Sequence, residues 1–515
     1  MARHTPTEDF SLEETSISAI HAAFRSGALT AQALVAGYQQ RIKTHDQAGA
    51  QLNAIVSLNP AARSVARTLD RAFAATGQLQ GPLHGVPVLL KDNIDTATVP
   101  TSYGSMAFAE HYPPTDATVV SRLQAAGAII LGKTTLPDFA TSWWAYSSRS
   151  GETRNPYALD RDPGGSSSGT GAAIAANFAS VGLGTDCGGS IRVPASHCNL
   201  VGIRSTPGVV SRAGSSPLVF FQDTVGPMAR TVTDAVRVFE VIAGYDPADS
   251  LSVNYTIAKS HQPYVAALDR DGLQGARIGL VTNAMGADDN PYAAPVNALM
   301  RAACITMEVA GAQVIPLEIA NLAQQLNDTS LYVNCSKSDL NRFLATRPTA
   351  PLRSLGQIFE ARRYHPMLDL LEACVVGPDQ AEYDPQYFRR LAARELFQRQ
   401  LTNLMAAQGL DALMFPDVQV VPPTREQLNT RVWTTLTYPT NTLIAAQSWL
   451  PALSVPAGFA PGHLPVGLEL MGRPYDEATL FRLAYAFEQA THHRRPPALS
   501  PSPAASGVKG GKRRG

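Results

Sequence analysis

Along the first third of the chain, the spacing of apolar residues changes from that of helices to the unbroken run of a buried strand. Residues 17–43 carry apolar side chains at helical spacing with an interruption at Gly27, which predicts two amphipathic helices. Residues 60–77 continue the helical pattern. The unbroken apolar run at 86–90 is typical of a short buried strand, and this strand ends at Lys91.

A unit of helix, glycine and strand recurs further along the chain. It is clearest at 119–134, where the helical pattern stops at Gly127, and similar units occur at 267–281 and 307–319. Strands that alternate with helices are typical of a sheet covered on both sides. The pattern therefore predicts an α/β fold: a single large domain with a central mixed β-sheet covered by helices on both faces.

The ends of the chain differ from this central pattern. Residues 1–80 are predicted to form an N-terminal helical segment packed on the core, and residues 81–500 to form the main domain. The pattern at 387–409 alternates charged and apolar residues and indicates a solvated surface helix. Residues 501–515 are Pro, Ser, Gly and basic residues, which predicts a disordered tail.

Composition narrows the class of protein. The 515 residues include 42 Lys plus Arg and 42 Asp plus Glu, so no net field favours nucleic acid or a membrane surface. The N-terminus is acidic before any apolar run, which is the wrong order for a secretory signal. The five cysteines are an odd number without ligand spacing, as expected of reduced thiols. We expect a cytoplasmic protein that binds neither nucleic acid nor a membrane.

Two glycine-serine clusters, at 164–171 and 184–190, carry the chemistry. Glycines beside a serine indicate a close approach of the backbone or unusual backbone angles, and the second cluster makes Ser190 a candidate nucleophile. The backbone N–H groups that can hold an oxyanion there belong to Cys187, Gly188, Gly189 and Ser190. His197 lies near in sequence, but Arg192 stands where a GxSxG elbow needs glycine, so a hydrolase of that type is not expected.

Three segments resemble the amidase signature hydrolases. HGVPVLLKDNID at 84–95 is similar to the lysine segment of that family, DPGGSSSGTG at 162–171 to its first serine segment, and GTDCGGSIRVPA at 184–195 to its nucleophile segment. Weaker similarity extends over most of the chain from about residue 81. The resemblance implies the amidase signature fold, and it implies that the unmatched region at about 284–408 covers the substrate.

The same resemblance assigns a Ser-cisSer-Lys triad. It implies Lys91 as the general base, Ser166 as the bridging serine and Ser190 as the nucleophile, with a cis peptide between Gly165 and Ser166. No metal or other cofactor is required. The first serine segment departs from the commoner family pattern at two positions, where Ser168 replaces a glycine and Thr170 replaces a serine.

Lys91 also has a simple physical interpretation. A lysine at the end of an apolar strand is desolvated, which lowers its pKa and leaves part of it neutral, as a base requires. The alternative is a structural ion pair with Asp92 or Asp95, and the two serine clusters favour the base.

Candidate substrate contacts are aromatic. They are Trp143, Trp144 and Tyr146, which follow a family-like segment, and Phe220 and Phe221, which precede another. Either group could instead be ordinary core.

The function expected is a serine hydrolase that cleaves amide C–N bonds through an acyl-enzyme, acting on aryl or hydrophobic amides and carbamates (urethanes), with esterase activity as a further option. Its partner is then a small-molecule amide or carbamate, and no obligatory partner chain is expected. One alternative is the glutamine-hydrolysing subunit of a tRNA-dependent amidotransferase, which needs a partner chain. A remote alternative is nucleotide binding, since Gly164 and Gly169 stand at P-loop spacing, although Thr170 occupies the place of the P-loop lysine.

Overall fold

The computed structural model describes residues 10–258 and 263–499, and most of its strands belong to one mixed sheet. The strands of this sheet are β1 (Ile55–Leu58), β2 (Pro87–Lys91), β3 (Ile129–Thr134), β6 (Val181–Asp186), β7 (Val201–Arg204), β8 (Thr224–Ala229), β9 (Arg277–Val281), β10 (Gln313–Leu317), β11 (Ala412–Pro416), β12 (Ala452–Ala460) and β13 (Leu464–Met471). A separate hairpin is formed by β4 (Tyr146–Ser147) and β5 (Gly151–Glu152).

The strand order in the sheet is β1-β3-β2-β6-β8-β7-β12-β13-β11-β9-β10. Strand β2 runs parallel to β3 and β6, and β9 runs parallel to β10 and β11, while the other neighbours are antiparallel. Because β2 and β6 are parallel neighbours, their carboxyl ends meet at one edge of the sheet. This edge holds Lys91 and the turn after β6.

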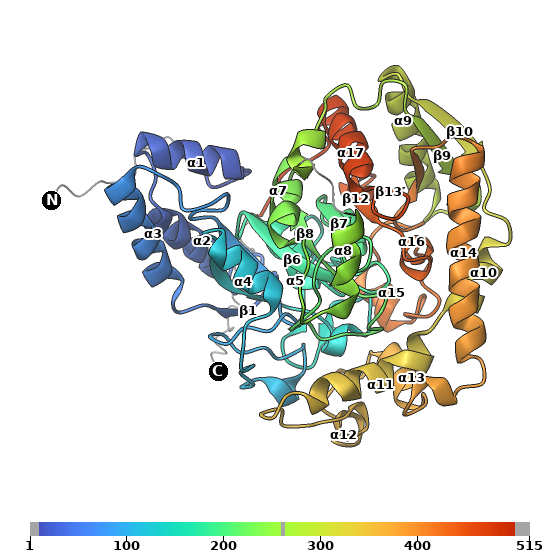
Figure 1. Cartoon of the computed structure of the whole chain (residues 1–515), viewed down its shortest axis with the longest axis horizontal. Helices are drawn as coiled ribbons and strands as arrows, with labels where there is room; N and C mark the ends of the chain where they lie inside the picture. Colours follow the sequence, from blue (N-terminus) through green and yellow to red (C-terminus); the bar gives the residue numbers. More distant parts are fainter. Residues whose placement is uncertain (1–9, 259–262, 500–515) are drawn as a thin grey trace, which may run out of the picture.

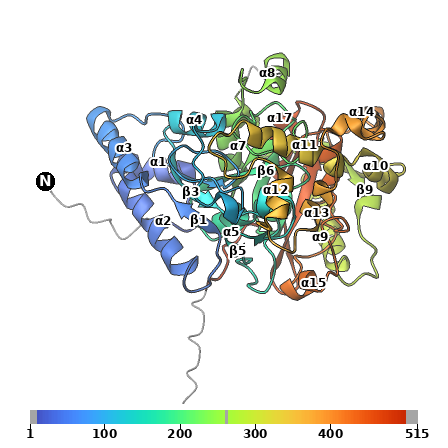
Figure 2. The ribbon, with the colours of Figure 1, turned by 90° about the horizontal axis from the view of Figure 1, so that it is seen from below.

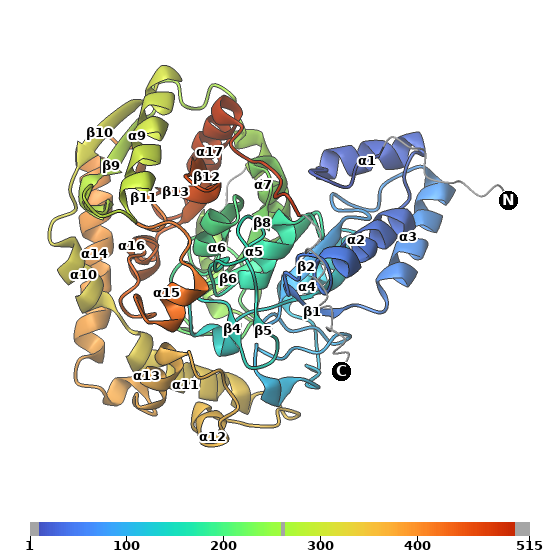
Figure 3. The same ribbon diagram turned by 180° about the vertical axis from the view of Figure 1, so that it is seen from behind.

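Helices surround the sheet (Figure 1). They are α1 (Ile17–Ser26), α2 (Ala31–His45), α3 (Ala62–Thr76), α4 (Thr118–Ala125), α5 (Ser168–Ala175), α6 (Arg192–His197), α7 (Val232–Ile242), α8 (Val253–Ala258), α9 (Ala294–Val309), α10 (Leu322–Thr329), α11 (Tyr332–Ala345), α12 (Leu355–Glu360), α13 (Asp369–Val375), α14 (Tyr387–Ala407), α15 (Arg425–Asn429), α16 (Leu443–Gln447) and α17 (Glu477–Thr491). Helices α11, α12 and α13 gather at the bottom of Figure 1 and lie across the face seen in Figure 2. Figure 3 shows α1, α2 and α3 together at the opposite end from α10 and α14.

Strand β2 shows why the sheet must be covered on both sides. Val88 and Leu90 join one hydrophobic cluster with residues of α4 and α7, while Leu89 between them joins another cluster with α1, α2, α3 and α5. Successive side chains of a strand point to opposite faces, so both faces of β2 are buried under helices. The predicted α/β fold with a central mixed sheet and helices on both faces is confirmed.

The N-terminal segment predicted to be helical also contributes a strand to the sheet, because β1 pairs with β3. Two further elements differ from the sequence pattern. The helix predicted within 267–281 is wrong, because residues before β9 form turns, in a segment with Gly272 and Gly275 where helix propensity is low. Helix α14 is present where a solvated helix was predicted, but it is not fully solvated, since Arg394 and Phe397 are completely buried. The predicted tail at 501–515 lies outside the described residues.

The structure also bears on membrane insertion. Within residues 10–258 and 263–499, no helix combines the length and the apolar character needed to cross a bilayer.

Candidate functional site

Lys91 is the last residue of β2, and its side chain is fully buried. Its Nζ donates to Ser166 Oγ at 2.7 Å and to Thr185 Oγ1 at 2.8 Å, with a longer contact to the Thr185 carbonyl at 3.3 Å. The parallel pairing of β2 with β6 places Thr185 beside the amine. Thr185 has no marked signal in the sequence beyond its position five residues before Ser190.

Burial lowers the pKa of Lys91 to about 7, because the charged ammonium loses its hydration, and the nearby carboxylate of Asp186 only partly opposes this effect. The alternative of an ion pair with Asp92 or Asp95 is wrong. Asp92 lies 3.5 Å from Lys133 Nζ, and Asp95 pairs with Arg347 at 2.5 Å.

Ser166 lies in the loop before α5, and the peptide bond between Gly165 and Ser166 is cis. The next residue links the two serine clusters, because the N–H of Ser167 donates to the carbonyl of Ser190 at 3.1 Å. The carboxylate of Asp162 accepts from the N–H of Gly164 at 2.7 Å and so holds the beginning of this loop.

The two departures from the family pattern have different surroundings. Thr170 Oγ1 lies 2.7 Å from Thr134 Oγ1 and donates to the Leu183 carbonyl at 3.3 Å, so it fastens α5 to β3 and β6. The buried hydroxyl of Ser168 has no hydrogen-bond partner among the described residues. A hydroxyl at position 170 is therefore used in packing the helix onto the sheet.

Ser190 follows β6 in a tight turn and is 6% exposed. It lines a small cavity of about 30 Å³, which we call the Ser190 cavity. The residues around this cavity are Ala140, Ser142, Trp143, Gly188, Ser190, Leu218, Tyr332, Leu370, Thr435 and Leu436. The hydroxyls of Ser190 and Ser166, both described, share no hydrogen bond. The lining of the Ser190 cavity carries no charged side chain.

The N–H groups predicted to bind an oxyanion are not equivalent. The N–H of Gly189 donates to Asp186 Oδ1 at 2.8 Å and is therefore engaged. In the described part of the chain, the N–H groups of Cys187, Gly188 and Ser190 have no hydrogen-bond partner. These three N–H groups remain available to a ligand.

Asp186 anchors this turn through a buried charge network that sequence reasoning missed. Arg192 Nη2 and Arg204 Nη1 each donate to Asp186 Oδ1 at 3.0 Å, and Arg192 Nη1 donates to Glu469 Oε1 at 2.5 Å. The two guanidinium groups hold the pKa of Asp186 well below its usual range, although burial acts in the opposite direction. The only sequence signal for this network is a lone acid, Glu469, inside the apolar strand β13.

Of the five aromatic residues predicted to contact substrate, Trp143 lines the Ser190 cavity. Trp144 packs edge-on against Tyr438, and Tyr146 stacks on His365. These two lie in the surrounding hydrophobic cluster.

The phenylalanines lie apart from the cavity lining. Phe220 is 44% exposed with Arg212 over its ring, and it lines a separate surface pocket. Phe221 packs edge-on against Trp449. Leu218, three positions before Phe221, is the member of this segment that reaches the Ser190 cavity.

His197 is buried on α6 and lies 3.3 Å from the Tyr438 hydroxyl through Nε2. Burial lowers the pKa of His197 to about 3, so this imidazole is neutral over the working pH range. Its hydrogen bond is directed to Tyr438 and not to Ser190.

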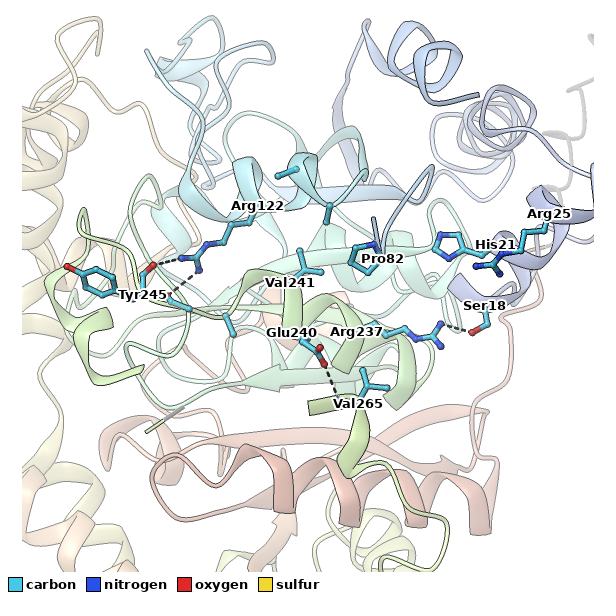
Figure 4. Close-up of a pocket in the computed structure, with 14 residues that line it drawn as sticks. Ser18, His21, Arg25, Pro82, Arg122, Arg237, Glu240, Val241, Tyr245 and Val265 are labelled. Atoms are coloured by element: carbon cyan, nitrogen blue, oxygen red, sulfur yellow. Dashed lines mark hydrogen bonds between the residues drawn. The ribbon is translucent and has the colours of Figure 1, made fainter. Parts of the chain in front are cut away.

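A broader surface pocket of about 810 Å³ lies between α1, α4 and α7 (Figure 4). Two of its three arginines are engaged within the protein, because Arg122 donates to backbone carbonyls that include that of Tyr245, and Arg237 donates to Ser18. None of the predicted catalytic residues lines it. The Ser190 cavity is therefore the candidate active site.

Comparison with known proteins identifies the family of the chain. The family model described as "Amidase" matches residues 33–481. The chain is 37% identical over 449 residues to a glutamyl-tRNA(Gln) amidotransferase subunit from Moorella thermoacetica, a match that covers 84% of this chain and 88% of that protein.

Solved structures of amidases are also similar to this chain. Native peptide amidase from Stenotrophomonas maltophilia is 37% identical, with a TM-score of 0.83 and coverage of 95% of this chain and 99% of that one. A bacterial aryl acylamidase is 24% identical, with a TM-score of 0.78 and coverage of 95% and 99%, and it supports the fold alone. The chain belongs to the amidase signature family, whose members hydrolyse amides.

Proposed function

We propose that the protein is a stand-alone serine hydrolase that cleaves small, neutral amides with a hydrophobic acyl or aryl group through an acyl-enzyme. The observation that carries this proposal is the 2.7 Å hydrogen bond from Lys91 Nζ to Ser166 Oγ, in a site that lowers the pKa of the amine to about 7. A buried lysine of this kind can accept a proton at neutral pH.

In the proposed mechanism, the Ser190 hydroxyl comes within hydrogen-bond distance of Ser166 when substrate binds, and neutral Lys91 then takes the proton of Ser166 as Ser166 takes that of Ser190. Ser190 Oγ attacks the amide carbonyl, and the oxyanion forms beside the unpartnered N–H groups of Cys187, Gly188 and Ser190. The relay then returns the proton to the leaving nitrogen, the C–N bond breaks, and the acyl group stays on Ser190. Water attacks the acyl-enzyme by the same relay and regenerates the starting state.

The lining of the Ser190 cavity supports an uncharged acyl group. Trp143, Leu218, Leu370 and Leu436 contribute apolar surface, and the lining includes no charged side chain. The free volume of this cavity is small, about 30 Å³. Leu436 is 63% exposed and is the member of the wall least held by packing.

The acyl or aryl preference includes peptide amides, anilides and carbamates (urethanes) as candidate substrates, with esters as a further possibility. The 37% identity with a peptide amidase supports peptide amides. The experiment compares ammonia or aniline release from these compounds by wild type, Ser190→Ala and Lys91→Met. Both variants should keep the fold and lose at least about 10³-fold in kcat/KM. Full activity of Ser190→Ala would contradict the proposal.

A second candidate is glutamine hydrolysis as part of an amidotransferase. It is favoured by relatives that are named as glutamyl-tRNA(Gln) amidotransferase subunits, and that role would require a partner chain. The uncharged lining opposes it, because the charged α-amino and α-carboxylate groups of glutamine would need buried partners. Ammonia release from glutamine by the isolated chain, faster than from a hydrophobic amide, would favour this second function.

A further inference from the structure

The turn that contains Ser190 has a simple geometric property. In a trans peptide, the C=O of one residue and the N–H of the next point in opposite directions. A donor that holds a carbonyl on the outside of the turn therefore directs the following N–H toward the inside. Four peptide planes, from Asp186 to Ser190, determine where the available N–H groups point.

In three of these planes, the carbonyl accepts a hydrogen bond of 2.6 or 2.7 Å. The carbonyls and their donors are Asp186 with Arg204 Nη1 (2.6 Å), Gly188 with Thr442 Oγ1 (2.6 Å) and Gly189 with the N–H of Val193 (2.7 Å). Arg204 belongs to the buried charge network, and Val193 to the first turn of α6. The Gly188–Gly189 plane is also held at its other end, because its N–H bonds to Asp186.

The remaining plane, between Cys187 and Gly188, depends on one side chain. Within the described residues, the Cys187 carbonyl accepts a side-chain hydrogen bond from Gln222 Nε2. Gln222 is completely buried, and the same nitrogen donates to Tyr332 Oη at 2.9 Å. Because a carbonyl can only accept, the amide nitrogen and not the amide oxygen must face Cys187.

This plane is also the easiest to turn. It ends at Gly188, and glycine permits backbone angles that other residues avoid. No residue with a side chain fits at this position, because a Cβ at Gly188 would lie 2.1 Å from Tyr332 Oη. Without Gln222, the buried Cys187 carbonyl would lack a donor, and rotation of the plane would relieve that loss while it moved the Gly188 N–H away from Ser190.

We infer that Gln222 is a positioning residue that holds the Cys187–Gly188 peptide so that the Gly188 N–H donates to the oxyanion formed when Ser190 attacks. This inference rests on the proposed function. Gln222 acts through the backbone, since it bonds to the Cys187 carbonyl and is not among the residues around the Ser190 cavity. Its removal should therefore weaken the transition state more than the bound substrate.

The test replaces Gln222 by methionine, which has nearly the same shape and no N–H donor. We expect Gln222→Met to lower kcat about 10- to 100-fold on a hydrophobic peptide amide, with KM changed less than about twofold. The matched control is Gln447→Met, because Gln447 is also buried but accepts a hydrogen bond from Thr329. The control should keep kcat within about twofold of wild type.

A second variant, Gln222→Glu, gives a pH signature that loss of packing would not produce. The introduced carboxyl group can donate to the Cys187 carbonyl only when it is protonated. The ratio of kcat in this variant to kcat in wild type should therefore rise at least about tenfold as the pH falls from 8 to 6.

The outcomes separate the two proposals. An unchanged kcat in Gln222→Met, a change confined to KM, an equal loss in Gln447→Met or a Gln222→Glu ratio that does not depend on pH would each overturn the role of Gln222. Wild type and Ser190→Ala are measured on the same substrate, so a failure of the proposed function appears as equal activity in those two proteins.

Discussion

Lowering the pH should abolish amide hydrolysis, because Lys91 becomes protonated. Only the neutral amine can accept a proton, and burial brings its pKa from the ordinary value of 10.5 to about 7. With that pKa, about nine in ten molecules carry the neutral amine at pH 8 and about one in a hundred at pH 5. We expect kcat/KM to fall by about 90-fold between these pH values, with a slope of one logarithmic unit per pH unit below about pH 6.

The assay measures initial rates on a peptide amide or anilide that has no titratable group, from pH 5 to pH 9. Circular dichroism at each pH checks that the chain stays folded. A useful control removes the other buried lysine of this region, because Lys133 on β3 is also fully buried and its partner is Asp92. The double variant Lys133→Met with Asp92→Asn removes both charges of that pair, and it should keep the inflection near pH 7.

Two results would refute this reasoning. One is a rate that stays level from pH 8 to pH 5 in folded protein, since the base would then not titrate in that range. The other is an inflection near pH 7 that disappears when Lys133 and Asp92 are replaced together, because the titrating group would then belong to that pair.

Two further predictions concern the walls of the site. Trp143→Ala should lower KM several-fold for amides with bulky acyl groups and reduce the free energy of unfolding by about 3–5 kcal/mol, measured by a substrate series and by urea denaturation; an unchanged order of preference would contradict a place for Trp143 at the acyl group. Arg192→Met leaves Asp186 and Glu469 buried with less compensation, so we expect a loss of about 3–5 kcal/mol in stability and a shift of the rate inflection to higher pH by up to about one unit. The exposed Arg301→Met is its control, and an inflection that moves to lower pH would contradict the electrostatic argument.

The sequence predicts those parts of the site that are contiguous in the chain. An apolar run that ends in a lysine predicts a desolvated amine, because a short continuous apolar run is typical of a fully buried strand. Glycines beside Ser190 predict a close approach, and in the structure Tyr332 and Thr442 occupy the space that side chains at Gly188 and Gly189 would need. The alternation of helices and strands predicts the layered fold, because the apolar spacing within each element shows which face that element buries.

Residues that reach the site from distant segments could not be predicted in this way. Tyr332, Leu370 and Leu436 line the Ser190 cavity from the region at 284–408 and from a later loop, and their neighbours in sequence show no pattern that points to Ser190. Phe220 illustrates the opposite error, because an apolar segment beside a family-like motif does not reveal which of its side chains turns inward. Leu218 does so, while the ring of Phe220 packs under Arg212.

The buried charges explain how one turn can be rigid while its lysine stays neutral. Asp186 is needed as an acceptor for the N–H groups of Gly189 and Ile191, which fixes the turn, yet its negative charge raises the pKa of Lys91. Two guanidinium groups bonded to the same carboxylate reduce that field, so desolvation remains the larger effect on the amine. A neutral acceptor in place of Asp186 would not raise the pKa of Lys91, but it could not bind two arginines and two N–H groups at once. The pair of arginines therefore serves both the shape of the turn and the protonation state of the base.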